Sequence, residues 1–222
     1  MKRFGRFCVF VACTTLVLAS FGIVKAQADV VSFLSGSQNW YPWDVRNSGS
    51  VDITVSQPRS GYGSLELNLT GGSDKAGAIF LPGFPPGTSL GTLDELNDLG
   101  FEWYRDSSST VGGHLVPALR LHAAAKVLNK SSNQQEDATI QIIWEWVYQN
   151  SGSALVNQWV TENDVQNGKF WIWVDGKGGI FKYLTLDQWD DNSSYIVNST
   201  YDLIYDPQSI QVFGVSVAAG SG

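Results

Sequence analysis

Residues 51–69 read VDITVSQPRSGYGSLELNL and indicate the fold class. Apolar and polar residues alternate at 51–55 and again at 64–69, and the segment between them contains Pro58, Gly61 and Gly63. Alternation with a period of two is typical of a β-strand with one buried face, whereas glycine and proline mark turns. The stretch therefore predicts two strands joined by a loop.

The same pattern continues along the chain. Further β-rich runs, separated by turn signals, lie at 78–81, 100–105, 118–122, 139–148, 170–174 and 210–217. Only two short helices are expected, at 92–99 and 185–188, where a threonine followed three residues later by Glu or Gln forms a capping box. Many short strands and few helices predict an all-β, two-sheet antiparallel sandwich of jelly-roll type, with a closed barrel as the alternative.

The first 28 residues differ from the rest. Three basic residues within the first six precede an apolar run from 7 to 24, and Ala-Gln-Ala follows at 26–28. This order is that of a secretory signal peptide, so we expect cleavage between Ala28 and Asp29. Residues 29–222 then form a single exported domain, secreted or at the cell surface. An uncleaved membrane anchor is the alternative interpretation.

Charge and cysteine content narrow the functional classes. Of 14 basic and 21 acidic residues, four basic and no acidic ones lie in the first 28, which leaves residues 29–222 with a net charge of −11. This acidity argues against a nucleic acid or an anionic membrane as partner, and we expect no membrane insertion of the exported domain. Both cysteines, Cys8 and Cys13, lie in the predicted signal peptide, so the domain must be held together by core burial without disulfides.

Aromatic residues suggest the ligand. All nine Trp and eight Tyr lie in 29–222, and their flat faces can stack on sugar rings while their polar edges hydrogen-bond hydroxyls. In the runs 139–148 and 170–174 the Trp and Tyr residues share strand faces, so we expect them to pack in the core. Trp40 and Trp43 lie beside Pro42 in a loop-like stretch and are candidate ligand contacts, with capping of the open end of the sandwich as the alternative.

The alternation with a period of two also predicts which polar side chains face outward. If Phe101, Trp103, Leu119 and Leu121 face inward, the polar residues between them face outward. Should these strands be neighbours, one sheet face would present together Glu102, Tyr104, Arg120, His122 and Glu145. We interpret this set as the ligand-binding face of an exported, non-catalytic module for carbohydrate or polysaccharide.

Two other functions stay open. A glycoside hydrolase could use Glu102 and Glu145 if their carboxyl groups lie about 5 Å apart or roughly 6.5 to 9.5 Å apart, the retaining and inverting spacings. An ion pair with Arg120 is the structural alternative for either Glu. A structural protein of an extracellular matrix or biofilm is the third reading. We favour binding over catalysis, because neither Glu lies in a motif with several acids.

No cofactor is expected from the sequence. Clustered oxygen ligands for a structural calcium are offered by Asp187, Asp190 and Asp191, but the acid spacing of an EF-hand loop is missing. With two histidines and no cysteine in the exported domain, a zinc site or a Ser-His-Asp triad has few residues to draw on.

The order of the segments also resembles a known group of proteins. Residues 31–81, with Trp40, the 51–55 strand and Gly-Tyr-Gly-Ser-Leu at 61–65, resemble the first half of carbohydrate-binding-module jelly rolls. The later segments look like secreted bacterial β-sandwich proteins that often carry a C-terminal PEP-CTERM sorting tail; these segments are 103–110, 117–121, 144–145, 168–171 and 215–222. Members of this group usually continue with a closing strand. The resemblance therefore implies either a fragment or a shortened member.

Overall fold

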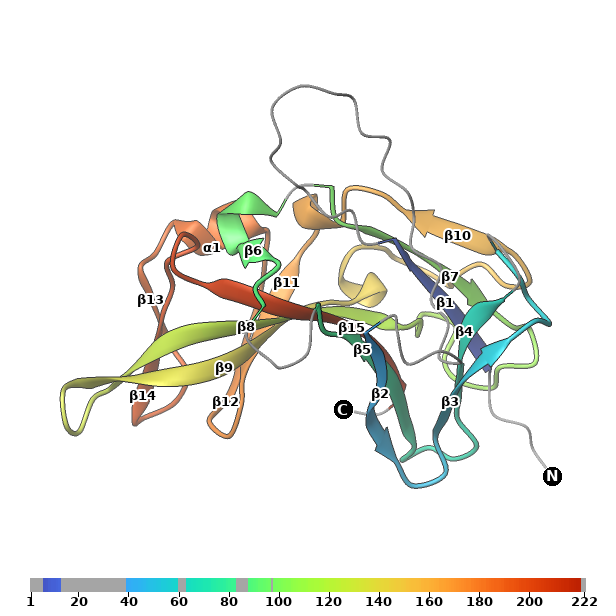
Figure 1. Cartoon of the computed structure of the whole chain (residues 1–222), viewed down its shortest axis with the longest axis horizontal. Coiled ribbons are helices and arrows are strands. Elements are labelled where there is room, and N and C mark those ends of the chain that lie inside the picture. The colour runs from blue at the N-terminus through green and yellow to red at the C-terminus, as the bar shows by residue number, and fades with distance from the viewer. Residues whose placement is uncertain (1–5, 13–38, 60–62, 83–87, 97, 221–222) are drawn as a thin grey trace.

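Two antiparallel sheets form the body of the protein in the computed structural model (Figure 1). The structure describes residues 6–12, 39–59, 63–82, 88–96 and 98–220, the first of these as backbone alone. The predicted all-β sandwich is confirmed, while the jelly-roll connection order stays a prediction. Among the described residues no helix has the length and apolar character needed to cross a bilayer.

The smaller sheet has five strands. Its order is β10 (Trp159–Glu162), β7 (Gly100–Arg105), β1 (Arg6–Ala12), β4 (Ser64–Asn68) and β3 (Ser50–Thr54). Every neighbouring pair in it is antiparallel. The two strands predicted from residues 51–69 are β3 and β4, and they pair with each other as neighbours in this sheet.

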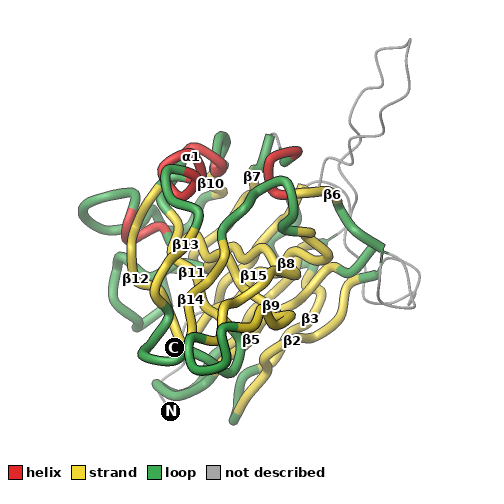
Figure 2. The backbone as a smooth tube through the Cα atoms, turned by 90° about the vertical axis from the view of Figure 1, so that its left-hand side faces the viewer, coloured by secondary structure: helices red, strands yellow, loops and turns green. Residues whose placement is uncertain are grey.

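The larger sheet is built around a long hairpin of β8 and β9. Its main order is β12 (Gly178–Leu184), β11 (Phe170–Val174), β9 (Gln134–Trp144), β8 (Ala118–Asn129), β15 (Gln211–Gly220), β5 (Lys75–Phe80) and β2 (Trp40–Arg46). Three short strands attach to it, namely β6 (Gly91–Thr92), β13 (Ser194–Ile196) and β14 (Tyr201–Ile204). Figure 2 shows the strands of the larger sheet lying side by side.

The core lies between the two sheets. Phe101 of the smaller sheet meets Trp144 of the larger one edge to face, with ring centroids 5.4 Å apart. Leu67 and Leu121, one from each sheet, are fully buried in the same apolar cluster. This burial contributes roughly 25 cal/mol for each Å² of apolar surface removed from water.

The short helical turns begin where the sequence predicts. The 3-10 helix η1 (Leu93–Glu95) follows Thr92, and the α-helix α1 (Leu186–Asp190) follows Thr185, each with a complete capping box. Two further 3-10 turns are η2 (Trp146–Tyr148) and η3 (Val165–Asn167). The expected strand at 139–148 therefore ends at Trp144, and the chain turns away from the sheet there.

Strand β1 comes from part of the predicted signal peptide. Its backbone is antiparallel to both β4 and β7, and it lies between them. β4 and β7 consequently run parallel to each other, about 10 Å apart, which is two strand spacings. The predicted cleavage site at Ala28 and Asp29 lies outside the described residues. Removal of residues 1–28 would take β1 out of the middle of the smaller sheet.

We expect a chain that starts at Asp29 to be less stable than the full chain, because the ladder hydrogen bonds of β4 and β7 toward β1 lose their partners. The melting temperature should fall by about 10 °C or more. In a protein of this size a loss of about 1 kcal/mol in unfolding free energy lowers it by roughly 2–4 °C, so this fall corresponds to a loss of roughly 3–5 kcal/mol. Thermal unfolding followed by near-UV circular dichroism measures the change. A peptide of residues 6–12 added to the shortened chain should restore part of the loss, and a shuffled peptide should not. Equal stability of the two chains would show that β1 is dispensable.

Candidate functional site

One row of directly paired residues crosses six strands of the larger sheet. From β2 to β11 the row consists of Tyr41, Ile79, Ser216, Arg120, Ile143 and Trp171. Residues that lie directly opposite each other on neighbouring strands point to the same side of the sheet. Leu119 and Leu121, on either side of Arg120, belong to the core. The row therefore lies on the side turned away from the smaller sheet.

A second row runs parallel to the first, two residues along each strand. Trp173 on β11 is paired with Gln141 on β9, and Gln141 is paired with His122 on β8. The side chain of Phe181, on β12, stacks against Trp171 with ring centroids 5.1 Å apart. We call this surface the Arg120 face; its members are Tyr41, Trp43, Arg120, His122, Gln141, Glu145, Trp171, Trp173 and Phe181.

Trp43 lies across the sheet toward β8. Its ring is 4.8 Å from the ring of His122, edge to face, and 5.2 Å from the guanidinium carbon of Arg120. The backbone of β2 lies close to β5 at this point, since a Cβ on Gly77 would come within 2.9 Å of the carbonyl oxygen of Trp43. A larger residue in place of Gly77 would push β2 away from the sheet.

The polar centre of the Arg120 face is only partly satisfied. Nη1 of Arg120 donates a long hydrogen bond of 3.3 Å to Oε1 of Gln141, while its Nε is buried and makes no hydrogen bond within the described residues. The amide of Gln141 in turn donates to Asp175 at 2.9 Å. Burial lowers the pKa of Arg120, and the attraction of Asp44 and Glu145 opposes this effect. A guanidinium with open donor positions can bind a ligand oxygen.

His122 supports this surface from below. Its side chain is buried, and Nε2 shares a 2.7 Å hydrogen bond with the hydroxyl of Ser216. The pKa of His122 is lowered to about 4, first because burial disfavours the charged ring and second because Arg120 repels it. The imidazole is therefore neutral at physiological pH. Because Trp43 and Phe213 contact its ring, His122 positions the face more than it contacts a ligand.

Glu145 joins the site at the end of strand β9. Its Oε2 accepts a 2.9 Å hydrogen bond from the indole Nε1 of Trp171. Its backbone oxygen accepts hydrogen bonds from Tyr148 and Gln149, which close the turn η2. The half-buried carboxylate therefore orients the indole of Trp171 on the Arg120 face.

Two predicted members of the site lie elsewhere, which corrects the expectation of a shared face. Glu102 and Tyr104 are on β7, which is in the smaller sheet and is not a neighbour of β8 or β9. Since Phe101 and Trp103 point into the core between the sheets, Glu102 points to the opposite outer surface. Its carboxylate accepts hydrogen bonds from Arg59, at 2.7 and 2.9 Å, and from Thr161. Tyr104 is buried beside Trp159.

The prediction that Trp40 contacts a ligand is also corrected. It is the first residue of β2, is 8% exposed, and packs in the core against Phe80. Pro42 predicts a loop, but β2 is an edge strand, where a proline can be accommodated without breaking a ladder on both sides. Period two then directs Trp40 inward and Trp43 outward, so that only Trp43 reaches the candidate site.

The two tryptophans of β11 were assigned to the wrong side of their strand. Phe170, Ile172 and Val174 are fully buried in the core, whereas Trp171 is half-buried and Trp173 is 37% exposed on the Arg120 face. All five residues are apolar, so alternation predicted that Trp171 and Trp173 share a face without showing which face is inside. The available signal was that both residues between Phe170, Ile172 and Val174 are tryptophan, which is less often fully buried than Phe, Ile or Val.

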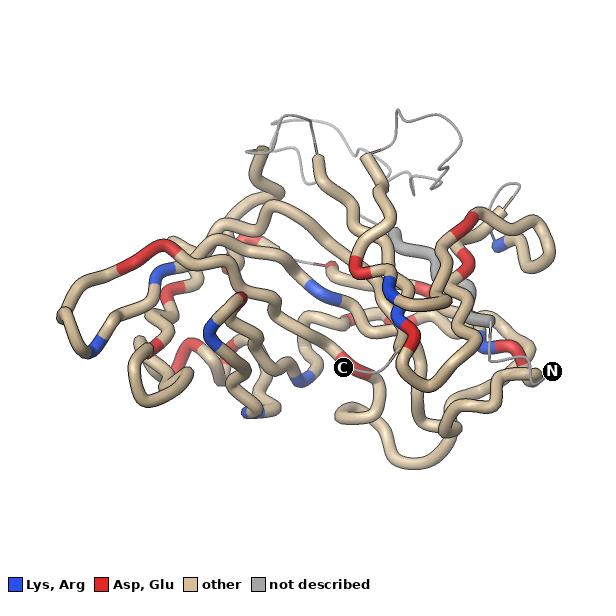
Figure 3. Tube along the Cα trace, turned by 90° about the horizontal axis from the view of Figure 1, so that it is seen from below, with Lys and Arg blue, Asp and Glu red and all other residues tan. Residues whose placement is uncertain are grey.

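The acidic residues that offered the weak calcium alternative lie on and just after the helix α1. Asp187 and Asp190 lie on α1 and Asp191 follows it, all with exposed side chains. Within the described part of the chain, no group of three or more Asp, Glu, His or Cys side chains could hold a metal ion. Figure 3 shows acidic and basic residues interspersed along the trace.

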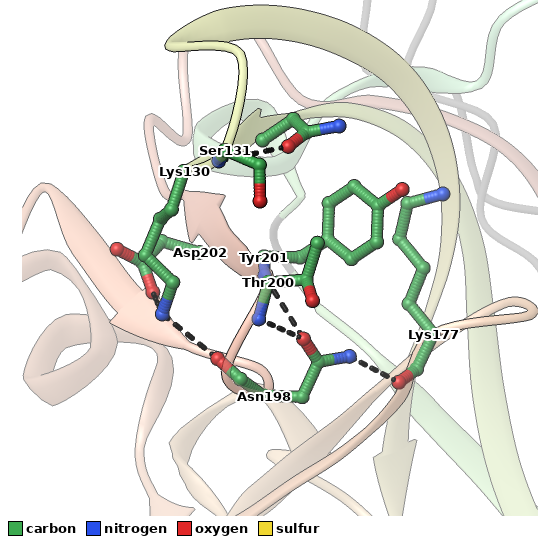
Figure 4. Close-up of polar contacts among 8 residues, drawn as sticks. Lys130, Ser131, Lys177, Asn198, Thr200, Tyr201 and Asp202 are labelled. Atoms are coloured by element: carbon green, nitrogen blue, oxygen red, sulfur yellow. Dashed lines mark hydrogen bonds and ion pairs between the residues drawn. The ribbon is translucent and has the colours of Figure 1, made fainter.

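A different polar cluster, at the turns that flank β14, satisfies its own hydrogen bonds (Figure 4). Oδ1 of Asn198 accepts hydrogen bonds from the backbone amides of Thr200 and Tyr201, at 2.7 and 2.9 Å. Its Nδ2 donates a hydrogen bond to the carbonyl oxygen of Lys177. The amine of Lys130 donates to the carbonyl oxygen of Asn198 and to Asp202. These side chains tie three turns together, which is a structural role.

We expect His122 to make the folded state sensitive to acid. A histidine in the unfolded chain takes up its proton near pH 6.5, whereas His122 in the folded protein does so only near pH 4. The contribution of His122 to the free energy of unfolding is therefore present in full above about pH 6.5. It is lost as the pH falls toward 4, and the loss amounts to about 3 kcal/mol. Urea unfolding at pH 7 and pH 4.5 should show a smaller loss for His122→Gln than for the wild type. The exposed His114, changed to Gln, is the matched control, and an equal loss in both variants would contradict the prediction.

No protein-family model, curated protein or solved structure matches the chain. The resemblance to carbohydrate-binding-module jelly rolls accordingly remains a prediction from the sequence.

Proposed function

We propose that the protein is an exported, non-catalytic module that binds a polysaccharide on the Arg120 face. The observation that carries the proposal is the combination of aromatic rings with hydrogen-bonding groups on one side of the larger sheet. Trp173 and Phe181 are 37% and 60% exposed, and Trp43 and Trp171 are half-buried beside Arg120 and Glu145. Such a surface matches a sugar, which has both C–H faces and hydroxyl groups.

The exposed aromatic rings leave apolar surface in contact with water unless a ligand covers them. Large apolar side chains that gather on an exposed surface mark interaction sites. Trp171 and Phe181 stack on each other with an interplanar angle of 29°, so that each covers part of the other, while Phe181 stays 60% exposed. A pyranose ring can stack on this exposed aromatic surface or on Trp173 while its hydroxyls reach Glu145, Gln141 or Arg120.

The placement of the two glutamates works against the hydrolase alternative. Acid and nucleophile must flank one glycosidic bond. Glu102 is on the outer surface of the smaller sheet, whereas Glu145 lies beside Trp171 of the larger one. The two sheets and the core between them separate these carboxylates. Glu102 is moreover occupied by Arg59 and Thr161.

Removal of a ring from the Arg120 face should weaken polysaccharide binding. We expect Trp171→Ala and Trp173→Ala each to lower affinity about 5- to 10-fold, because truncation of a central aromatic contact typically costs more than about 1 kcal/mol. Affinity electrophoresis in gels that contain neutral and acidic polysaccharides measures the loss. Trp159→Ala, a half-buried tryptophan of the smaller sheet, is the matched control and should leave migration unchanged.

Two results would contradict this proposal. One is the absence of retardation by every polysaccharide in the panel. The other is an equal effect of the Trp159 and Trp173 substitutions. If the protein binds no sugar but self-associates through a strand edge, a structural role in an extracellular matrix would replace the binding role.

A further inference from the structure

The guanidinium of Arg120 is the least satisfied charged group on the Arg120 face. It has five N–H donors, of which Nη1 makes a 3.3 Å hydrogen bond to Gln141 and the buried Nε makes none within the described residues. Its other close partner is the ring of Trp43, 5.2 Å from Cζ. Buried polar groups in folded proteins are nearly always hydrogen-bonded, so a buried donor without a partner calls for an explanation.

The neighbouring carboxylates are already engaged. Asp44 forms ion pairs with Arg46 and, at 3.7 Å, with Lys75. Glu145 accepts the hydrogen bond from the indole of Trp171. Among the described residues no carboxylate lies within 4 Å of the Arg120 guanidinium as an ion-pair partner. The site thus holds a cation that has no carboxylate ion-pair partner among the described side chains.

Folding alone gives no reason to keep this charge. Desolvation is the largest influence on Arg120, and it lowers the pKa because burial disfavours the charged form. A buried charge costs free energy unless it is paired and hydrogen-bonded, so an apolar residue of similar size should be tolerated at this position. Gly77, Ser216 and Ala218 are small residues on the same side of the sheet, on the two strands between Trp43 and Arg120.

We propose that Arg120 binds a carboxylate on the sugar, so that the ligand is an acidic polysaccharide containing uronic acid residues. This inference rests on the proposed function. A carboxylate presents two oxygens in one plane, which match the parallel N–H groups of a guanidinium, and such charge-assisted pairs are stronger than neutral hydrogen bonds. Trp43 and Trp171 lie on strands to either side of β8, so an extended polysaccharide that crosses the sheet can contact both rings with Arg120 between them.

The net charge of the protein affects how the binding of an acidic polysaccharide depends on salt concentration. The chain has a formal net charge of −7, which repels a polyanion at long range. Added salt screens that repulsion beyond a Debye length of about 8 Å at 0.15 M, but screens a buried contact much less. Binding to an acidic polymer should therefore hold steady or strengthen between 20 and about 150 mM salt. A surface patch of lysines would show the opposite trend.

The experiment compares a polymer with and without its carboxylates. Alginate, polygalacturonate and hyaluronate are each titrated into the full chain by calorimetry, in parallel with the carboxyl-reduced form of the same polymer. At least one acidic polymer should bind 10-fold or more tightly than its reduced form. Dextran sulfate is included beside dextran, so that a sulfate-specific site would be recognised and would overturn the carboxylate assignment.

Variants of Arg120 separate ligand binding from folding. Arg120→Gln should remove the preference for the carboxylate form, and Arg120→Lys should keep part of it. Arg59→Gln, on the smaller sheet, is the matched control and should keep it in full. Arg120→Met should melt at the same temperature as the wild type or above it. If Arg120→Met unfolds instead, Arg120 is a structural residue and the inference is wrong.

The outcomes for the two proposals differ. Equal affinity for the acidic and carboxyl-reduced polymers would overturn the carboxylate inference and leave the polysaccharide-binding function standing. Binding of neither form, with the chain folded, would contradict the binding function itself and the inference with it.

Discussion

The alternation of strand β8 is the constraint on which the rest of the structure depends. Its odd-numbered residues from Leu119 to Val127 are buried in the core, whereas Arg120 and His122 point to the other side of the sheet. β8 lies between β9 and β15, so its register sets which residues of both neighbours face inward. A shift of one residue would turn the apolar set outward and bury the guanidinium, and the apolar core makes such a shift prohibitively costly.

The Arg120 face and the cluster around Asn198 illustrate two uses of polar groups. Around Asn198, donors and acceptors from three turns satisfy one another at 2.7 to 3.0 Å, and this order holds the loops. At Arg120 the hydrogen bonds are incomplete, and the surrounding surface consists of aromatic rings and small residues. The satisfied hydrogen bonds around Asn198 stabilise the fold, whereas the incomplete hydrogen bonds of Arg120 cost it some stability. Such a local cost is typical of a surface shaped for a ligand.

Much of the fold could be predicted, because local pattern and burial agree over long stretches. The strands at 100–105 and 170–174 have the expected bounds, and both threonine capping boxes open short helices. The candidate site was predicted only in part. Arg120, His122, Glu145 and Trp43 come together, but Glu102 and Tyr104 belong to the other sheet and Trp40 to the core. Sequence pattern shows which residues of one strand share a face; it does not show which strands are neighbours.

The sequence by itself determined the all-β class, the period-two sorting within each strand and the acidic, aromatic-rich character of the domain. These are local properties, set by residue type and spacing. Only the tertiary structure decided that β8 pairs with β9 and β15, that β7 lies in the smaller sheet and that Trp171 faces outward. Strand pairing joins residues far apart in the chain, and its outcome depends on the packing of both sheets at once. The Arg120 face draws on β2, β8, β9, β11 and β12, and it exists only because that packing places these strands in one sheet.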